Sequence, residues 1–274
     1  MFIPLHDANQ LRHIHLQYVT IAIIALNCLV FIIIGAGSLA DDSFARAAFY
    51  SFGYVPAVAS GTAALPGELR ILPEWADYVT YAFLHGDFWH LAGNMLFLWV
   101  FADNVEDATG HFRFALFFVI CAAAGAYLHL LADPASEQPL IGASGAASGV
   151  VAAYLMLHPR VKLWVLALGR IPLRLRAYWI LGAWILFQFA SFVAMPEDDV
   201  SWAAHAGGIV AGAVLIPFLK RRDVPLFDKG LSEAIPPDVA DEPIAATDEK
   251  AAMRQQARPS ASPPPGVWGR RDPS

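Results

Sequence analysis

The sequence predicts an all-α fold, a polytopic membrane protein built as a bundle of six transmembrane helices. Of its 274 residues, 57% are hydrophobic and 15% are charged, a balance unlike that of soluble domains. Several apolar windows approach the roughly 20 residues that a helix needs to cross a bilayer. Lys and Arg are concentrated in alternate connections between these windows. These observations predict one helical membrane domain over residues 1–222, followed by a polar tail over 223–274.

Six windows are expected to cross the membrane as helices. In chain order they are residues 18–37, 89–105, 112–132, 142–158, 177–194 and 201–219. Ser38-Leu39-Ala40, after the first window, weakly resembles a signal-peptidase site. The polar lead-in is long, however, and the apolar run has full spanning length, so we interpret this window as a retained span rather than a cleaved signal peptide.

The charge of the connections predicts the orientation of the bundle. Residues 159–176 contain five Lys or Arg and no acid, whereas 133–141 and 195–200 contain acids and no Lys or Arg. Arg12 precedes the first span, and Lys220-Arg221-Arg222 follows the last. The positive-inside rule therefore predicts a multi-pass membrane protein with both termini in the cytoplasm. The membrane that we expect for it is the inner (plasma) membrane.

Two long segments lie outside the spans. Residues 38–88 combine turn-forming Pro and Gly with Trp75 and the adjacent Trp89, which predicts a structured loop in the outer headgroup region. Residues 223–274 are rich in Pro, Ala, Asp and Glu, and such a segment buries too little apolar surface to fold, so we expect a disordered cytoplasmic tail. The chain has neither a nucleotide-binding glycine loop nor a basic nucleic-acid patch, so neither nucleotide nor nucleic acid is an expected partner.

A run of small residues, Gly142-Ala143-Ser144-Gly145-Ala146-Ala147-Ser148-Gly149, opens the fourth window and allows two interpretations. The first is packing, because Gly145 and Gly149 have the small-xxx-small spacing that lets membrane helices approach closely. The second is a nucleophile, Ser144, whose small neighbours let a substrate carbonyl reach its hydroxyl. Taken alone, the run favours packing, because small-residue motifs are common in membrane helices. Residues elsewhere in the chain reverse this interpretation.

Ionisable side chains are costly inside a bilayer, so each one within a span is a functional candidate. His129, His158 and Asp103 lie near span ends and are interpreted as structural. His90 and His205 lie well inside, and Asn94 follows His90 by one helical turn, on the same face.

The spans that carry Ser144, His205, His90 and Asn94 all enter from the outer side. His205 comes about six residues into the sixth span, or roughly 9 Å at 1.5 Å per residue. A lone membrane histidine could simply bridge two helices by a hydrogen bond. Four polar groups at similar depth, on an otherwise apolar background, instead favour a site that opens to the outer side.

The chemistry that suits this set is acyl transfer. Serine and histidine supply a nucleophile and a general base, while Asn94, His90 and the backbone N–H of Ser144 can donate to an oxyanion. No acid inside the spans is available to orient the imidazole, so the set predicts a Ser–His dyad. There is no HExxH motif and no pair of intramembrane aspartates, so neither a metal, nor another cofactor, nor an aspartyl mechanism is expected.

Three pieces of the chain resemble the rhomboid intramembrane serine proteases of the bacterial six-span form. They are Gly142-Ala143-Ser144-Gly145, the Ala204-His205 element with Gly208, and residues 83–95, which contain His85, His90 and Asn94. The similarity covers about residues 1–222 and implies a six-transmembrane-helix rhomboid-like bundle.

The resemblance implies Ser144 as nucleophile, His205 as base, and His90 and Asn94 as oxyanion-hole donors. It assigns packing positions at the active site to three glycines, Gly142, Gly145 and Gly208. His85 matches a residue that supports the second helix, outside the catalytic set. The implied substrates are single-span or polytopic membrane proteins in the same lipid bilayer, cleaved within a transmembrane helix near the outer face, without metal or ATP.

The sequence departs from the family pattern at two places. Ser148 stands where the family often has an aromatic residue that stacks on the base, and the first outer loop lacks an evident Trp-Arg pair. One alternative function is a non-proteolytic rhomboid-like scaffold that binds membrane helices, although its mark would be loss of the serine or the histidine. A channel or transporter would predict intramembrane charges or broken half-helices, which the spans lack.

Overall fold

The computed structural model describes residues 2–7, 9–41, 43–167, 169–195 and 200–228. The tail predicted over 223–274 therefore lies almost wholly outside the described residues, as does most of the acidic connection at 195–200. The division of the chain at residue 222 and the disorder of the tail stay predictions.

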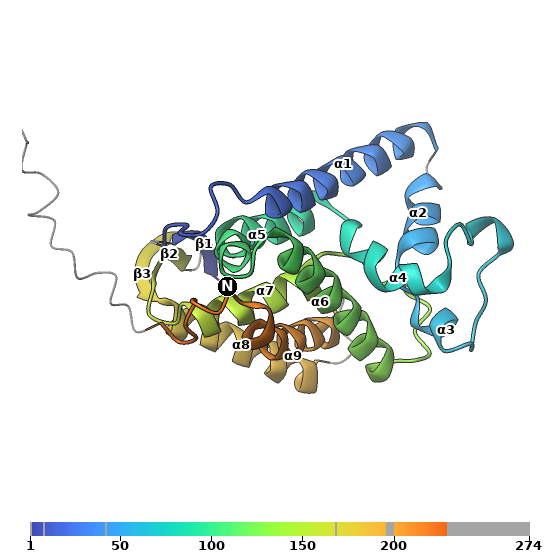
Figure 1. The fold of residues 1–274 in the computed structure, drawn as a ribbon. Coiled ribbons are helices and arrows are strands. Elements are labelled where there is room, and N and C mark those ends of the chain that lie inside the picture. Colours follow the sequence, from blue (N-terminus) through green and yellow to red (C-terminus); the bar gives the residue numbers. More distant parts are fainter. Residues whose placement is uncertain (1, 8, 42, 168, 196–199, 229–274) are drawn as a thin grey trace, which may run out of the picture. The chain divides into compact units, whose positions relative to one another are not determined.

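The described residues contain six long helices, and each one overlaps an expected span. They are α1 (Tyr18–Ala40), α5 (Phe88–Thr109), α6 (His111–Ala132), α7 (Ser144–Leu157), α8 (Ala177–Ala194) and α9 (Trp202–Leu219). Their arrangement confirms a helical membrane bundle (Figure 1).

Four of these helices, α1, α6, α8 and α9, are long and apolar enough to cross a membrane within the described residues. The other two differ for physical reasons. The last two turns of α5 carry Asp103, Glu106 and Asp107, and α7 has 14 residues, which is about 21 Å of helix. The expected count of six spans stays a prediction.

The connection at 38–88 is folded, as its turn formers and aromatic residues predict. It contains α2 (Phe44–Phe52), α3 (Pro56–Ala59), η1 (Gly67–Leu69), α4 (Glu74–Thr80) and η2 (Tyr81–Phe83). Tyr54 pairs with Leu140 in an isolated antiparallel bridge, so this segment is fastened to the connection that precedes α7. Its location in the headgroup region stays a prediction.

A three-stranded antiparallel sheet is an addition to the expected helices. It consists of β1 (Phe2–Asp7), β2 (Lys162–Ala167) and β3 (Ile171–Arg176), in the order β1-β2-β3. Along β2, Leu163 and Val165 are buried on one face of the sheet, and Trp164 between them is exposed on the other. Pro172 is tolerated in β3 because β3 is an edge strand. The sheet and α2–α4 lie at opposite ends of the bundle (Figure 1).

Two carboxylates at the end of α5 fasten the N-terminal segment to the bundle. Glu106 is fully buried and accepts hydrogen bonds from the backbone N–H groups of Val19 and Thr20 and from the Thr20 hydroxyl. Since these N–H groups belong to the first turn of α1, Glu106 satisfies donors that the helix itself leaves unpaired.

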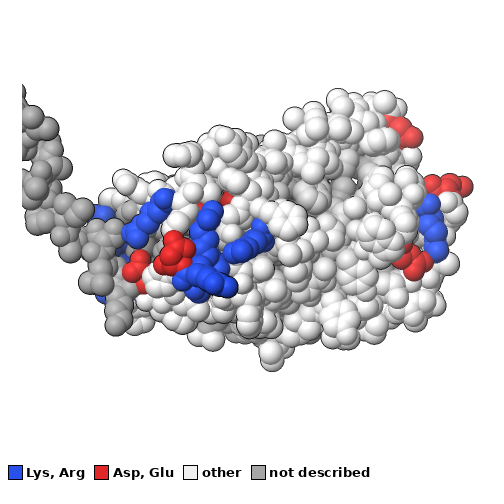
Figure 2. All heavy atoms as spheres, viewed as in Figure 1, with Lys and Arg blue, Asp and Glu red and all other residues white. Residues whose placement is uncertain are grey.

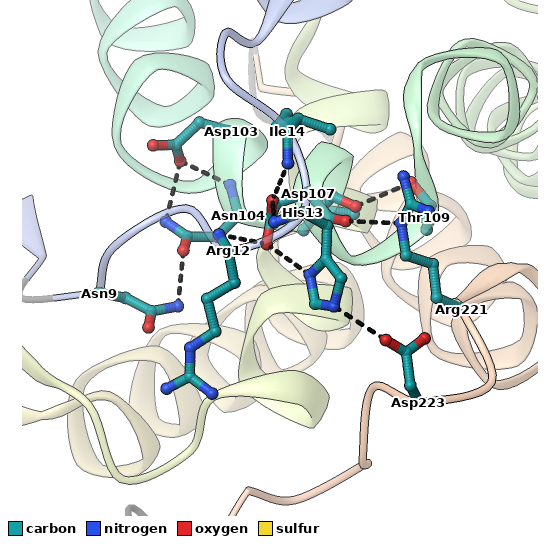
Figure 3. Close-up of polar contacts among 11 residues, drawn as sticks. Asn9, Arg12, His13, Ile14, Asp103, Asn104, Asp107, Thr109, Arg221 and Asp223 are labelled. Atoms are coloured by element: carbon teal, nitrogen blue, oxygen red, sulfur yellow. Dashed lines mark hydrogen bonds and ion pairs between the residues drawn. The ribbon is translucent and has the colours of Figure 1, made fainter. Parts of the chain in front are cut away.

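Asp107 makes a second attachment at the same end (Figure 3). Its carboxylate accepts from the backbone N–H groups of Arg12, His13 and Ile14 at 2.7–3.1 Å. The His13 ring lies 3.1 Å from Asp107 on one side and 3.1 Å from Asp223 on the other. This polar network joins the segment before α1 to the end of α5 and to the residues after α9.

Charged side chains avoid the middle of the bundle on the face shown in Figure 2. Lys, Arg, Asp and Glu gather near the β1–β3 end and near α2–α4, while the surface between them is uncharged. Large apolar side chains are exposed on the long helices, for example Ile32 of α1 and Leu186 of α8. This distribution fits a protein whose middle faces lipid rather than water.

Candidate active site

The helices α5, α7 and α9 begin at the same end of the bundle, opposite the sheet, and each start carries a predicted site residue. Ser144 is the first residue of α7, His90 is the third of α5, and His205 is the fourth of α9. All three are half-buried, whereas Asn94, one turn further along α5, is buried.

Side-chain caps fix where two of these helices begin. Asp87 accepts from the backbone N–H groups of Trp89 and His90 at 2.7 and 3.0 Å. Ser201 accepts from the backbone N–H of Ala204 at 3.2 Å, and its hydroxyl also lies 2.9 Å from the ring nitrogen Nδ1 of His129. These caps determine the positions of His90 and His205 on their helices.

Gly142 brings the connection before α7 against the predicted oxyanion-hole donors. A Cβ on this residue would lie 2.5 Å from Nε2 of His90 and 3.6 Å from Nδ2 of Asn94. Its φ of +113° also lies in a region that L side chains rarely adopt. Gly142 is anchored by its N–H, which donates to the carbonyl of Tyr81 at 3.0 Å. Position 142 therefore requires glycine for two reasons, the positive φ of its backbone and the lack of room for a Cβ beside the His90 ring.

Gly145 brings the other side of the Ser144 backbone against α9. A Cβ on Gly145 would lie 2.9 Å from the Tyr81 hydroxyl and 3.3 Å from the carbonyl oxygen of Ala204. A Cβ on Gly208 would overlap the Gly145 carbonyl, and Gly149 and Gly212 repeat this contact one turn later. The small-xxx-small run thus does pack two helices, and Ser144 lies beside the crossing.

The Asn94 amide is oriented by His85. Nδ2 of Asn94 lies 3.0 Å from Nε2 of His85, which also accepts from the backbone N–H of Ala143 at 3.4 Å. Burial, together with the nearby His90, lowers the pKa of His85 to about 3, so its ring is neutral at physiological pH and can accept. An amide nitrogen carries two hydrogens, so the second one is left to donate to a ligand.

Two residues that the sequence analysis did not predict contact the His205 ring. Nδ1 of His205 lies 2.7 Å from Oε1 of Gln188, on α8, and the Trp202 ring stands edge-on at 5.7 Å between centroids. Gln188 is only 2% exposed. An amide is not ionisable, so the cost of burying charge does not single out Gln188, although it is the only Asn or Gln between 177 and 194.

Ser148 is buried one turn after Ser144, at the position where the resemblance leads one to expect an aromatic side chain. The contacts that the His205 ring does make are the hydrogen bond with Gln188 and the edge-on packing of Trp202. Trp184 and Phe187 of α8 pack on Phe97 and Trp202, respectively. The departure at Ser148 thus leaves the His205 ring with partners on two neighbouring sides.

The other intramembrane candidates have local partners. His129 bonds Ser201, His158 packs edge-on against Tyr154, and Asp103 accepts from Asn104. Within the described part of the chain, no group of three or more His, Cys, Asp or Glu is placed to hold a metal ion. That the protein needs no cofactor stays a prediction.

Comparisons with known proteins agree on one family. A family model described as "Rhomboid domain" matches residues 72–222. The chain is 33% identical over 154 residues to "Rhomboid protein 1, mitochondrial" of Saccharomyces cerevisiae, covering 50% of this chain and 42% of the relative. It is 30% identical over 150 residues to "RHOMBOID-like protein 5" of Arabidopsis thaliana, covering 54% and 46%.

A human relative, "Rhomboid-related protein 3", is 26% identical over 163 residues, which cover 56% of this chain and 39% of the relative. The chain thus spans about half the length of the curated relatives it matches. The match at 72–222 contains all the predicted site residues.

Proposed function

The chain belongs to the rhomboid family, and on this premise we propose that it is an intramembrane serine endopeptidase that uses Ser144 and His205 as a catalytic dyad. One observation carries the proposal. On one side of Ser144, a Cβ added at Gly142 would lie 2.5 Å from His90 and 3.6 Å from Asn94, and on the other side a Cβ added at Gly145 would lie 3.3 Å from the Ala204 carbonyl on the helix of His205.

In the proposed reaction, Nε2 of His205 accepts the hydroxyl proton of Ser144 as Oγ attacks the carbonyl carbon of a substrate peptide bond. The imidazolium then gives that proton to the leaving amine, the C–N bond breaks, and an acyl-enzyme remains. A water molecule, deprotonated by the same imidazole, hydrolyses the ester and restores both side chains.

His90, Asn94 and the backbone N–H of Ser144 are proposed to donate to the oxyanion. The N–H of Ser144 belongs to the first turn of α7, where helix N–H groups lack intrahelical partners. Removal of one such donor typically lowers kcat by about 10²- to 10³-fold. The hydrogen bond that the Asn94 amide donates to His85 supports this role, because it fixes the orientation of that amide.

The proposed substrates are single-span or polytopic membrane proteins, cleaved within a transmembrane helix. Basic residues concentrate at the sheet end, for example in 159–176, so we place that end in the cytoplasm and the site near the outer face of the inner (plasma) membrane. A substrate helix is proposed to enter laterally between α5 and α8 and to unwind locally at the cleaved bond.

The test is cleavage of a model single-span substrate in liposomes by the purified protein and by the Ser144→Ala variant. We expect the wild type to produce two fragments and the variant to produce none above background. A wild-type protein that binds the substrate helix but never cleaves it would favour a non-proteolytic scaffold. Undiminished cleavage by the variant would exclude Ser144 as the nucleophile.

A further inference from the structure

We propose that Gln188 is a positioning residue for His205, which holds the imidazole in the tautomer that leaves Nε2 free to act as a base. This inference rests on the proposed dyad and adds a third member from a different helix. The bond from Nδ1 of His205 to Oε1 of Gln188 is 2.7 Å long.

The chemistry of an amide oxygen determines the tautomer. Oε1 of Gln188 accepts hydrogen bonds and cannot donate them, so the His205 nitrogen that faces it must carry the hydrogen. A neutral imidazole has one N–H, so the opposite nitrogen, Nε2, retains its lone pair. Only that tautomer can accept a proton from a serine hydroxyl on the Nε2 side.

Burial makes this bond worth more than one at a surface. Gln188 is 2% exposed, and α8 offers the His205 ring no ionised group in its described residues. A buried amide or imidazole without a hydrogen-bond partner is costly, so breaking the bond between Gln188 and His205 would leave two unsatisfied polar groups. Trp202, edge-on to the ring, limits rotation of the imidazole away from Gln188.

In the described part of the chain, the two side chains that contact the imidazole, Gln188 and Trp202, carry no charge. Gln188 comes from α8 and Trp202 from α9 itself, and His90 lies on α5 beside the same connection as Ser144. Unlike the aspartate of a Ser-His-Asp triad, Gln188 orients the ring without adding a negative charge that would stabilise imidazolium. Substitutions at position 188 can therefore separate the effect of orienting the His205 ring from the effect of placing a negative charge beside it.

Two variants exploit this distinction. Gln188→Met keeps the length and volume of the side chain but removes the acceptor. Gln188→Glu keeps an acceptor at Oε1 and adds a charge. Ser191→Ala is the matched control, because Ser191 is also a buried polar residue of α8 and makes no contact with His205 among the hydrogen bonds described.

The first readout is the pH profile of cleavage, with kcat and KM measured separately. We expect Gln188→Met to lower kcat by about 10- to 100-fold with little change in KM, since part of the general-base contribution is lost. Gln188→Glu should retain most of kcat and move the acidic limb of the profile to higher pH. Ser191→Ala should resemble the wild type in both respects.

The second readout does not depend on activity. In protein with ¹⁵N-labelled histidine, the His205 signals, assigned by loss in a His205→Ala variant, should show Nδ1 protonated in the wild type and a tautomer mixture in Gln188→Met. If both variants lower kcat equally and leave the tautomer unchanged, Gln188 has a structural role only and the proposal is wrong. Wild-type kinetics in Gln188→Met would overturn it as well.

Failure of the dyad itself gives a different pattern. If Ser144→Ala cleaves as fast as the wild type, the proposed function is wrong, whatever the tautomer of His205. If Ser144 is essential and Gln188→Met is fully active, the dyad stands and the positioning role falls.

Discussion

Gly208 of α9 and Gly145 of α7 bring two helix backbones into direct contact, because a methyl group on Gly208 would overlap the Gly145 carbonyl oxygen. Since Ser144 and His205 lie within one turn of this contact, the crossing of α7 and α9 sets the distance between the proposed nucleophile and base. Any side chain at the crossing would separate them.

Replacement of Gly208 by Ala should therefore cost both stability and activity. We expect the free energy of unfolding to fall by about 1–3 kcal/mol, as is typical of overpacking. We also expect the rate of cleavage to fall, because the added methyl group moves His205 away from Ser144. The measurements are thermal unfolding in detergent and cleavage of the model substrate.

The matched control is Gly182→Ala, because a Cβ at Gly182 has no atom within 4 Å. That variant should be neutral or up to about 1 kcal/mol more stable, from helix propensity alone. Equal behaviour of the two variants would contradict the proposed crossing.

Removal of the Asn94 amide should impair catalysis more than binding. We expect Asn94→Ala to lower kcat by about 10²- to 10³-fold with a small change in KM, since the lost hydrogen bond forms to the oxyanion. His85→Ala should produce a smaller loss of the same kind, because it leaves the amide present but unanchored. A change confined to KM would argue against an oxyanion-hole role.

The buried carboxyl of Asp7 should make stability fall as pH rises. Burial raises its pKa to about 6 from 3.8, against the hydrogen bonds from Tyr154 and Asn104, which lower it. The folded state thus holds the proton more tightly, so stability declines between about pH 4 and 6 and levels off above.

Asp7→Asn keeps an acceptor for Tyr154 and Asn104 and should remove this decline. At pH 8 the variant should be more stable by about 3 kcal/mol, which is the free energy that corresponds to a pKa rise from 3.8 to about 6. Unfolding in detergent from pH 4 to 8 measures the effect, with Glu68→Gln, an exposed change on η1, as control. An unchanged slope in Asp7→Asn would show that Asp7 is not responsible.

The two carboxylates that face His13 should differ sharply in their importance. Asp107 is buried and accepts from three backbone N–H groups, so Asp107→Ala should destabilise the protein by about 2–4 kcal/mol. Asp223 is exposed, and Asp223→Ala should leave the unfolding temperature nearly unchanged. Similar losses in both variants would mean that the contacts of the His13 ring, rather than the backbone hydrogen bonds to Asp107, hold the segment.

The sequence predicts the helices well because each is a local apolar run. The window at 177–194 coincides with α8, and the other five helices begin or end within a few residues of expectation. The window at 142–158 begins too early because Gly142, at φ +113°, cannot be helical. The window at 89–105 ends too early because Glu106 and Asp107 find partners in the N-terminal segment.

The remaining features depend on contacts between distant parts of the chain. β1 pairs with β2 across more than 150 residues, and nothing in residues 2–7 alone indicates a partner. The contact of Gln188 with His205 likewise requires the packing of α8 on α9. By contrast, Ser144, His205, His90 and Asn94 could be proposed from the sequence, because polar residues at one depth in apolar spans are rare.

The most direct test of the central claim is covalent labelling with a fluorophosphonate, followed by mapping of the modified residue by mass spectrometry. The proposed dyad predicts modification at Ser144, strongly reduced in His205→Ala and retained in the control Ser191→Ala. Labelling of a different residue, or equal labelling of Ser144 with and without the His205 imidazole, would contradict a Ser144–His205 dyad.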